Sequence, residues 1–439
     1  MDRIQIFVDA TTENESSEEI QKHMKLFQYA TDAMVSGPTK FPKPTDYYFS
    51  TKSTTTPIEE KVSDRTYEIV PYLQPVYGTH RPEEDAVIAF AAEYPLSNYI
   101  SFIESLRVTG FTGDIVLAIS PLDMRKEDVW AYLTEPNNHI VLYAPVLTCY
   151  NAEQEVVESA KGGARLCICN HIYGQRHKSD KTVTPIVDPR TPRTVQTLRY
   201  EIYWLMLLPI SQQSWILLVD ARDTYFQLDP FAAVPRQTDF QKRSGLLYFF
   251  GENIDATRLG QSKSNRKWLE AAYGDTITAV LQDKPTICSG ATMGEQIALE
   301  TYIRAMVGES DTTGTVLAGA DQGFHNYLYY SYKFQFTETI HDIVVFDQGQ
   351  GIVNNMGALR TKELREWGNG NIIQVTTDEE ETNPKKKHSY IVLNWDGTPS
   401  PVVHQFDRHQ QLSDYYFKIK AGQFTSAWEQ RKQNLPLTE

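Results

Sequence analysis

The feature that most constrains the fold is a run of five apolar residues, 215–219, that ends in the carboxylate of Asp220. An unbroken apolar run of this length predicts a strand that is buried on both faces. Ligands of open parallel sheets bind beyond the carboxyl ends of the strands. The run therefore predicts a helix-covered, mostly parallel sheet, and it makes Asp220 the place where chemistry is expected.

Shorter apolar runs and helix-like segments alternate along the rest of the chain. We expect strands at 86–92, 113–120 and 139–147, and helices at 96–108, 124–133 and 191–210. The last helix is predicted to begin at Thr191-Pro192, an N-cap residue followed by a proline. Alternation at this spacing predicts an α/β fold, a mostly parallel sheet flanked by helices on both faces.

Composition changes along the chain and predicts three parts. Residues 1–80 contain Ser/Thr/Glu-rich and Pro/Lys-rich stretches, which are typical of an irregular, stem-like N-terminal extension. We place one α/β domain at 81–420 and a C-terminal tail at 421–439. A charged loop at 378–387 is interpreted as solvated.

Charge and hydropathy exclude two classes of protein. The chain has 42 Lys+Arg and 56 Asp+Glu residues and a net charge of −14, so a nucleic-acid partner is not expected. No apolar stretch approaches the roughly 18 residues of a membrane span. We expect no membrane span in this chain, and an anchor upstream of residue 1 stays open.

The four cysteines are Cys149, Cys167, Cys169 and Cys288, too few for a disulfide-built scaffold. They are interpreted as four buried thiols. The alternative is one bridge between Cys149 and either Cys167 or Cys169, in a secretory lumen. A sequon at Asn14 is compatible with that compartment.

Two carboxylates, Asp220 and Asp223, follow the apolar run with Arg222 between them. Paired carboxylates at a strand end can hold a hard divalent cation and leave sites open for phosphate. Residues i and i+3 of a regular strand face opposite ways, so the two acids can share an ion only if the chain turns after Asp220. The alternative is one solvated acid and one acid paired to Arg222.

The sequence at 220–231, DARDTYFQLDPF, resembles the acidic metal motif of GT-A glycosyltransferases in a DxRD-type variant. Residues 288–294 (CSGATMG) resemble the NSG-type strand of that superfamily, with Cys288 where asparagine is commoner. Residues 319–326 (GADQGFHN) resemble the DQ motif of glycogenin-like retaining transferases, and 391–409 resemble the C-terminal segment whose histidine completes the metal site. The resemblance covers about 85–415 and implies a GT-A, Rossmann-like mixed sheet.

The resemblance implies a metal site and a catalytic pair. Asp220, Asp223 and His404 would hold Mn²⁺ or Mg²⁺, with Asp220 binding either the metal or the ribose. The alternative for His404 is a satisfied histidine at a strand edge. Asp321 and Gln322 are the implied catalytic residues at the start of a helix, where the helix dipole favours an ionised Asp321. Retention of configuration is expected, and the alternatives are that Asp321 is a helix N-cap or the general base of an inverting reaction.

The implied binding site for the nucleotide sugar draws on several segments of the chain. Its residues are Ala92, Tyr94, Arg199, Asp220, Ala221, Arg222, Ser289 and Gly290. Arg199 would clamp phosphate, and its alternative is a pair with Glu201 or solvent exposure. Tyr94 would stack on the nucleotide base, and Gly290 would allow a sugar to approach the backbone closely.

The activity implied by the resemblance is transfer of a hexose or pentose from a nucleotide-diphosphate sugar, expected to be UDP-linked, to a hydroxyl acceptor on a glycan, glycoprotein or small molecule. The Golgi or secretory lumen is the implied location, with the cytoplasm as alternative. Two other functions stay open. The chain is a non-catalytic nucleotide-sugar or glycan-binding module, or it is a phosphohydrolase, although Arg222 occupies the place of the second acid in the DxDxT motif of such enzymes.

Overall fold

The computed structural model describes residues 41–49, 66–136, 138–157, 166–236, 245–359, 372–375 and 389–434. Its centre is a seven-stranded sheet in the order β15-β13-β14-β11-β2-β3-β4. The strands are β2 (Ala86–Phe90), β3 (Asp114–Ala118), β4 (Ile140–Tyr143), β11 (Trp215–Val219), β13 (Leu246–Gly251), β14 (Ile287–Glu295) and β15 (Asp342–Phe346). Only β14 runs antiparallel to its neighbours in this sheet, so the sheet is mixed and mostly parallel.

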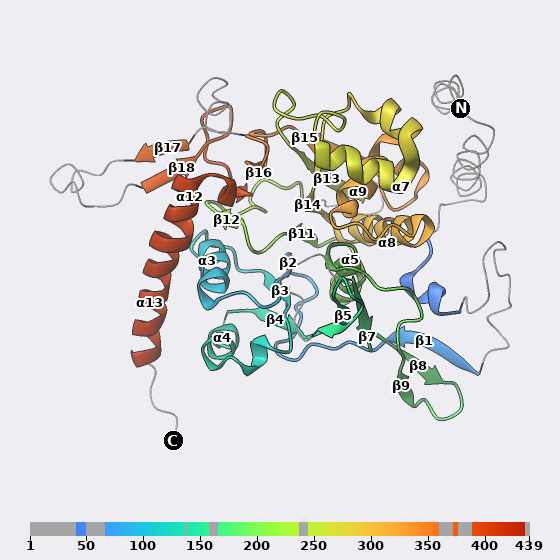
Figure 1. Cartoon of the computed structure of the whole chain (residues 1–439). Helices are drawn as coiled ribbons and strands as arrows, with labels where there is room; N and C mark the ends of the chain where they lie inside the picture. Colours follow the sequence, from blue (N-terminus) through green and yellow to red (C-terminus); the bar gives the residue numbers. More distant parts are fainter. Residues whose placement is uncertain are drawn as a thin grey trace.

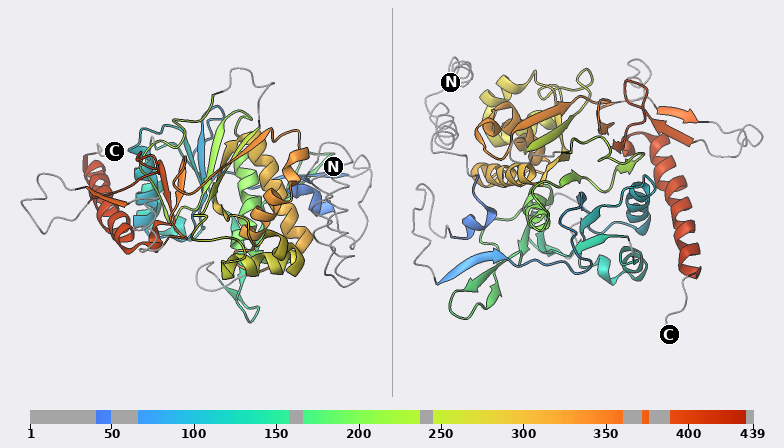
Figure 2. Two further views of the ribbon diagram at one scale, coloured as in Figure 1. Left: turned by 90° about the horizontal axis from the view of Figure 1, so that it is seen from above. Right: turned by 180° about the vertical axis from the view of Figure 1, so that it is seen from behind.

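Helices cover both faces of the sheet, as Figure 1 and the view from above in Figure 2 show. One face carries α3 (Leu96–Arg107), α4 (Glu127–Leu133) and α13 (Ala421–Asn434), and the other carries α5 (Val195–Leu207), α7 (Lys263–Leu281), α8 (Gln296–Thr313) and α9 (Ala320–Tyr330). Successive side chains of a strand point to opposite faces. Accordingly, Ile216 and Leu218 belong to one apolar core, and Trp215, Leu217 and Val219 belong to the other. This arrangement confirms the predicted fold class.

Smaller sheets surround the central one. They are β1 (Tyr67–Pro71) with β8 (Tyr173–His177) and β9 (Val183–Pro185); β10 (Arg193–Thr194) with β7 (Leu166–Asn170), β5 (Val146–Tyr150) and β6 (Val156–Val157); β12 (Thr224–Phe226) with β19 (Val402–His404) and β16 (Val353–Asn355); and β17 (Ile372–Val375) with β18 (Ser389–Val392). Short helical segments are η1 (Pro44–Phe49), η3 (Asp123–Arg125), η4 (Lys333–Phe336), η5 (Phe406–Arg408), α12 (Gln410–Asp414) and η6 (Tyr415–Lys420). The sheet that contains β12 positions the candidate site.

Two predicted elements have different bounds in the structure. The strand predicted at 139–147 is two strands, β4 and β5, because Pro145 between them has no N–H to donate to a ladder. The helix predicted from Thr191 begins at Val195 with Thr194 as its N-cap. Residues 193 and 194 pair with β7 instead, so sheet pairing takes precedence over the Thr-Pro start signal.

The prediction of four free thiols is wrong, because Cys149 and Cys167 form a disulfide. These two residues lie opposite each other on the antiparallel strands β5 and β7, so their side chains meet on one face. Cys169 and Cys288 are free and buried. The disulfide joins the two central strands of the four-stranded sheet.

The described residues include parts of both segments predicted to flank the domain. Strand β1 lies within 1–80, and in α13 the Trp428 ring packs edge-on against Tyr132, 5.3 Å between centroids. The division at residues 81 and 420 stays a prediction. The sequon at Asn14 and the loop at 378–387 lie outside the described residues. Among the described helices, none has the length and apolar character needed to cross a bilayer.

Candidate active site

The candidate site begins where β11 ends. After Val219 the chain turns through residues 221–223, and the Thr224 hydroxyl donates to the Asp220 carbonyl at 2.7 Å. This turn places Asp220 and Asp223 on the same side of the strand end. The condition for a shared ion, a turn directly after Asp220, is therefore met.

Pairing of two distant segments brings His404 to the two acids. In the antiparallel pair β12–β19, Thr224 lies opposite His404, so the imidazole lies beside Asp223. The Nε2 atom of His404 is 3.9 Å from Oδ2 of Asp220 and 3.9 Å from Oδ1 of Asp223. The three side chains form the one His/Cys/Asp/Glu cluster in the described residues that is close enough to share a metal ion.

The geometry of this cluster fits a divalent cation. The Nε2 atom of His404 is buried, and it has no hydrogen-bond partner among the described residues. Two ligands of one Mg²⁺, each about 2.1 Å from the ion, lie roughly 3 to 4 Å apart, and both distances from Nε2 of His404 to the carboxylates are within this range. A Cβ at Gly290 would lie 2.7 Å from Cε1 of His404 and 2.8 Å from Oδ2 of Asp220. Glycine therefore keeps open the space that the three ligands face.

The two acids of the cluster have opposite pKa shifts. Burial acts to raise the pKa of Asp220, but the Arg199 guanidinium and His404 outweigh it and lower that pKa below its ordinary value. Burial raises the pKa of Asp223; His404 opposes the increase and the Asp220 carboxylate adds to it. The acid with the lowered pKa is also the more exposed one: the Asp220 side chain is 35% exposed and that of Asp223 is 5% exposed.

Asp321 and Gln322 lie next to this cluster, at the start of α9. The backbone N–H of Ser289 donates to Oε1 of Gln322 at 2.6 Å, and the Ser289 hydroxyl donates to Oδ2 of Asp321 at 3.1 Å. The Gln322 amide in turn donates to Oε1 of Glu252 at 3.3 Å. The strand motif at 288–294 and the helix motif at 319–326 therefore meet through Ser289.

Arg199 joins the two groups of acids. From α5, it donates through Nη1 to Asp220 and through Nη2 to Oδ2 of Asp321, at 3.1 Å for the second. Its guanidinium is thus engaged by two carboxylates rather than by Glu201 or solvent. Asp321 is the second residue of α9, whose N-cap is Gly319, so it is not itself the N-cap. Burial raises the pKa of Asp321 against the opposing charge of Arg199.

The remaining predicted binding residues lie around the acids. Arg222 is half-exposed and pairs with Asp407 at 3.0 Å and with Asp223 at 3.4 Å. Ala221 is buried within the turn. Burial, and then the charge of the Asp220 carboxylate, raise the pKa of Tyr94 above its ordinary value.

Ala92 lines a cavity of about 250 Å³ at the carboxyl ends of β2 and β3. Its other lining residues are Phe90, Glu93, Ile119, Ser120, Pro121, Leu122, Arg125, Pro145, Val146, Leu147 and Cys149. Sequence reasoning identified only Ala92 among them. The others come from the ends of several strands and from β5, whose position the sequence did not predict.

Sequence reasoning also missed two polar residues that contact the predicted ones. Glu252 follows the apolar strand β13 as Asp220 follows β11, and this shared signal, an apolar run ending in an acid, was available to find it. Oδ1 of Asn355 lies 2.8 Å from Nδ1 of His404. A single asparagine in a short strand carries no such signal.

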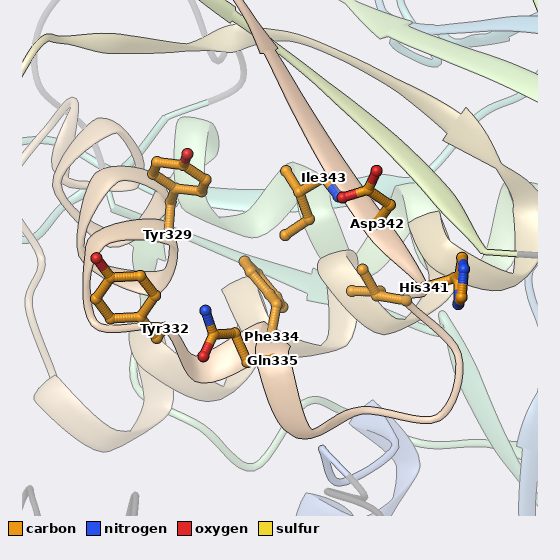
Figure 3. A pocket seen from close by; sticks show the side chains of 8 residues that line it. Tyr329, Tyr332, Phe334, Gln335, His341, Asp342 and Ile343 are labelled. Carbon is orange, nitrogen blue, oxygen red and sulfur yellow. The ribbon is translucent and has the colours of Figure 1, made fainter. Parts of the chain in front are cut away.

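A larger cavity, of about 420 Å³, lies between the end of α9 and the start of β15 and is shown in Figure 3. Its lining residues are Tyr329, Tyr332, Phe334, Gln335, Ile340, His341, Asp342 and Ile343. Strand β15 is parallel to β13, which has the direction of β11, so its first residue lies at the edge of the sheet opposite Asp220. This cavity shares no residue with the candidate site.

Comparisons with known proteins give matches in structure alone. No protein-family model matches the chain, and no curated protein matches it. Among solved structures, 86 chains match.

Two of these matches are structures of LgtC. A structure of an active-site mutant has 11% identity and a TM-score of 0.37, and the match covers 79% of this chain and 95% of that one. LgtC described as a galactosyltransferase in complex with donor and acceptor sugar analogues has 10% identity and a TM-score of 0.38, with the same coverage. The bifunctional glycosyltransferase WbbM has 12% identity and a TM-score of 0.38, and the match covers 81% of this chain and 52% of that one. These structural neighbours are glycosyltransferases.

Proposed function

We propose that this chain is a metal-dependent glycosyltransferase that moves a sugar from a nucleotide-diphosphate sugar to a hydroxyl acceptor. The observation that carries the proposal is the meeting of two polar groups at the end of β11. Asp220, Asp223 and His404 form one group, and Asp321 with Gln322 forms the other. Arg199 connects them, so a diphosphate at the first group would hold its sugar against the second.

In this proposal Asp220, Asp223 and His404 hold Mn²⁺ or Mg²⁺, which stabilises the negative charge that develops on the leaving diphosphate. The oxygen-rich, one-imidazole ligand set suits these ions better than Zn²⁺. One carboxylate oxygen of Asp220 also accepts a hydrogen bond from Arg199. The Asp220 side chain is partly exposed, so we propose that it can also contact the ribose. Arg222, between the two acids, is proposed to contact phosphate.

The donor is proposed to be a UDP-sugar whose base occupies the cavity beside Ala92. That cavity lies at the carboxyl ends of β2 and β3, where open parallel sheets bind nucleotides, and Tyr94 is close by along the chain. Asp321 is proposed to orient a sugar or acceptor hydroxyl, and Gln322 to lie beneath the anomeric carbon of a reaction that retains configuration. Ser289 holds both side chains in place.

We further propose the catalytic domain at 81–420 and a Golgi or secretory lumen as its location. The Cys149–Cys167 disulfide supports a lumen, since disulfides persist in oxidising compartments and are rare in the cytosol.

The test is nucleotide release from a panel of UDP- and GDP-sugars with Mn²⁺ or with EDTA. We expect slow hydrolysis of one donor that EDTA stops and that Asp223→Asn reduces by about 100-fold or more, because a buried ligand is lost. Asp180→Asn is the matched control, since Asp180 is exposed and bonds only within its own turn among the described contacts. Metal-dependent binding of UDP without any turnover would favour the binding module. The absence of both UDP binding and nucleotide release would overturn the proposal.

A further inference from the structure

The imidazole of His404 is held by a buried amide that is itself held. Oδ1 of Asn355 lies 2.8 Å from Nδ1 of His404, while Nδ2 of Asn355 donates to the carbonyls of Phe250 and Gly251 at 2.9 and 3.0 Å. Both side chains are fully buried. The parallel pair β16–β19 places Asn355 directly beside His404.

These contacts determine which way the amide faces. If the Asn355 side chain were rotated by half a turn, its oxygen would face two carbonyl oxygens, and two buried carbonyls would lose their donor. With Oδ1 toward His404, the only group that can complete this bond is a hydrogen on Nδ1. The Sγ atom of Cys288, 3.9 Å from the same nitrogen, is a weak acceptor that requires no other arrangement.

We infer that Asn355 is a positioning residue that keeps the hydrogen of neutral His404 on Nδ1, so that the lone pair of Nε2 points at the space between Asp220 and Asp223. Metal-binding histidines commonly donate their other ring nitrogen to such a partner, which fixes the tautomer and the ring orientation. This inference rests on the proposed function and deepens it, because it identifies the residue that orients His404 for metal binding. The two carbonyls that hold the Asn355 amide lie at the end of β13, and Glu252, which accepts from Gln322, directly follows that strand.

The first test needs no variant and no metal. In uniformly ¹⁵N-labelled protein at pH 8, long-range ¹H–¹⁵N correlation spectra distinguish the two neutral tautomers of a histidine. We expect the His404 signal, identified by its absence in His404→Gln, to be that of the Nδ1–H tautomer. A neutral Nε2–H tautomer would overturn the inference while leaving the proposed transferase function untouched.

The second test measures Mn²⁺ affinity directly, by electron paramagnetic resonance of the free ion, in wild type and in Asn355→Leu. We expect the variant to bind about 10- to 100-fold more weakly, the range typical of lost outer partners of a metal ligand. Asn354→Leu is the matched control. Asn354 is an equally buried amide on the same strand, bonded to Gln348 and Ser400 rather than to His404.

The outcomes separate the inference from the proposed function. Equal losses in Asn355→Leu and Asn354→Leu would show a general effect of removing a buried amide, and no loss in Asn355→Leu would show that His404 needs no positioning; either overturns the inference. Absence of Mn²⁺ binding by wild type, with the Nδ1–H tautomer present, would instead count against the metal site of the proposed function. If Asn355→Leu does not fold, the tautomer measurement on wild type still decides.

Discussion

Gly290 lies so close to His404 that a Cβ on the glycine would be 2.7 Å from Cε1 of the imidazole. The same atom would lie 2.8 Å from Oδ2 of Asp220, and both partners belong to the candidate metal cluster. Since His404 is fully buried and bonded to Asn355, it has little room to move.

We therefore predict that Gly290→Ala displaces the candidate metal ligands His404 and Asp220. Misplacement of about 1 Å can reduce catalysis about 100-fold, so Mn²⁺-dependent nucleotide release should fall by roughly that factor. The free energy of unfolding should fall by about 1–3 kcal/mol, the usual effect of overpacking. Gly422→Ala is the control, because a Cβ there has no neighbour within 4 Å. If Gly290→Ala released nucleotide at the wild-type rate, the three candidate ligands would not act together.

Arg199 is predicted to be essential for the stability of the site. It bonds both Asp220 and Asp321, and the two carboxylates would face each other without a cation in Arg199→Met. Removing one partner of a buried ion pair lowers the free energy of unfolding by about 3–5 kcal/mol. Urea unfolding at pH 7 would detect this decrease. Adding Asp321→Asn to Arg199→Met should recover part of this loss, because one of the unpaired charges is removed.

The exposed pair of Arg266 and Glu270 provides the comparison for Arg199. The same change, Arg266→Met, should cost far less than Arg199→Met, since solvent screens that pair. Equal effects of the two substitutions would mean that Arg199 contributes no more than a surface residue.

His325 is predicted to make stability depend on pH. Burial lowers the pKa of His325 to about 3 from an ordinary value of 6.5, and the ring packs between Tyr302 and Phe249. The unfolded chain therefore binds a proton that the folded chain excludes, so stability is fully present above pH 6.5 and falls as the pH is lowered toward 3.

A shift of one pKa unit corresponds to about 1.4 kcal/mol, so this residue should remove about 2 kcal/mol between pH 6.5 and 5. In His325→Phe the free energy of unfolding should fall less steeply over this interval, and the slopes of the two proteins should coincide between pH 7 and 8. Identical slopes from pH 6.5 to 5 would contradict the neutral, buried state of this histidine.

The Cys149–Cys167 disulfide is predicted to stabilise the folded chain by about 3 kcal/mol, since it closes a loop with a sequence separation of 18 residues. The double variant Cys149→Ser/Cys167→Ser should lose this amount in denaturant unfolding. Reductant should lower the stability of wild type to that of the variant and leave the variant unchanged. Detection of four alkylatable thiols in unfolded wild type without reductant would show that the bridge is absent.

Some of the fold and of the candidate site could be predicted locally. The run at 215–219 is a buried strand because every residue in it is apolar. The strand ends at Val219, where the apolar run gives way to the charged Asp220. The turn that unites Asp220 and Asp223 depends on Thr224, whose hydroxyl bonds the Asp220 carbonyl, and nothing in residue spacing indicated it. The start of α5 was misplaced because pairing of residues 193 and 194 with β7 is a non-local contact.

Local patterns in the sequence predict the alternation of buried strands and helices and the two acids at the strand end, because apolar patterning and residue type act over a few neighbouring positions. The resemblance to GT-A glycosyltransferases, and not local patterning, added His404, Asp321 and Gln322 to the candidate residues. Contacts between distant segments pair Cys149 with Cys167, join Arg199 to Asp220 and Asp321, and bring Asn355 against His404. Each of these contacts joins side chains from different strands or helices. The register of those elements is selected by packing of the whole core, which no local pattern records.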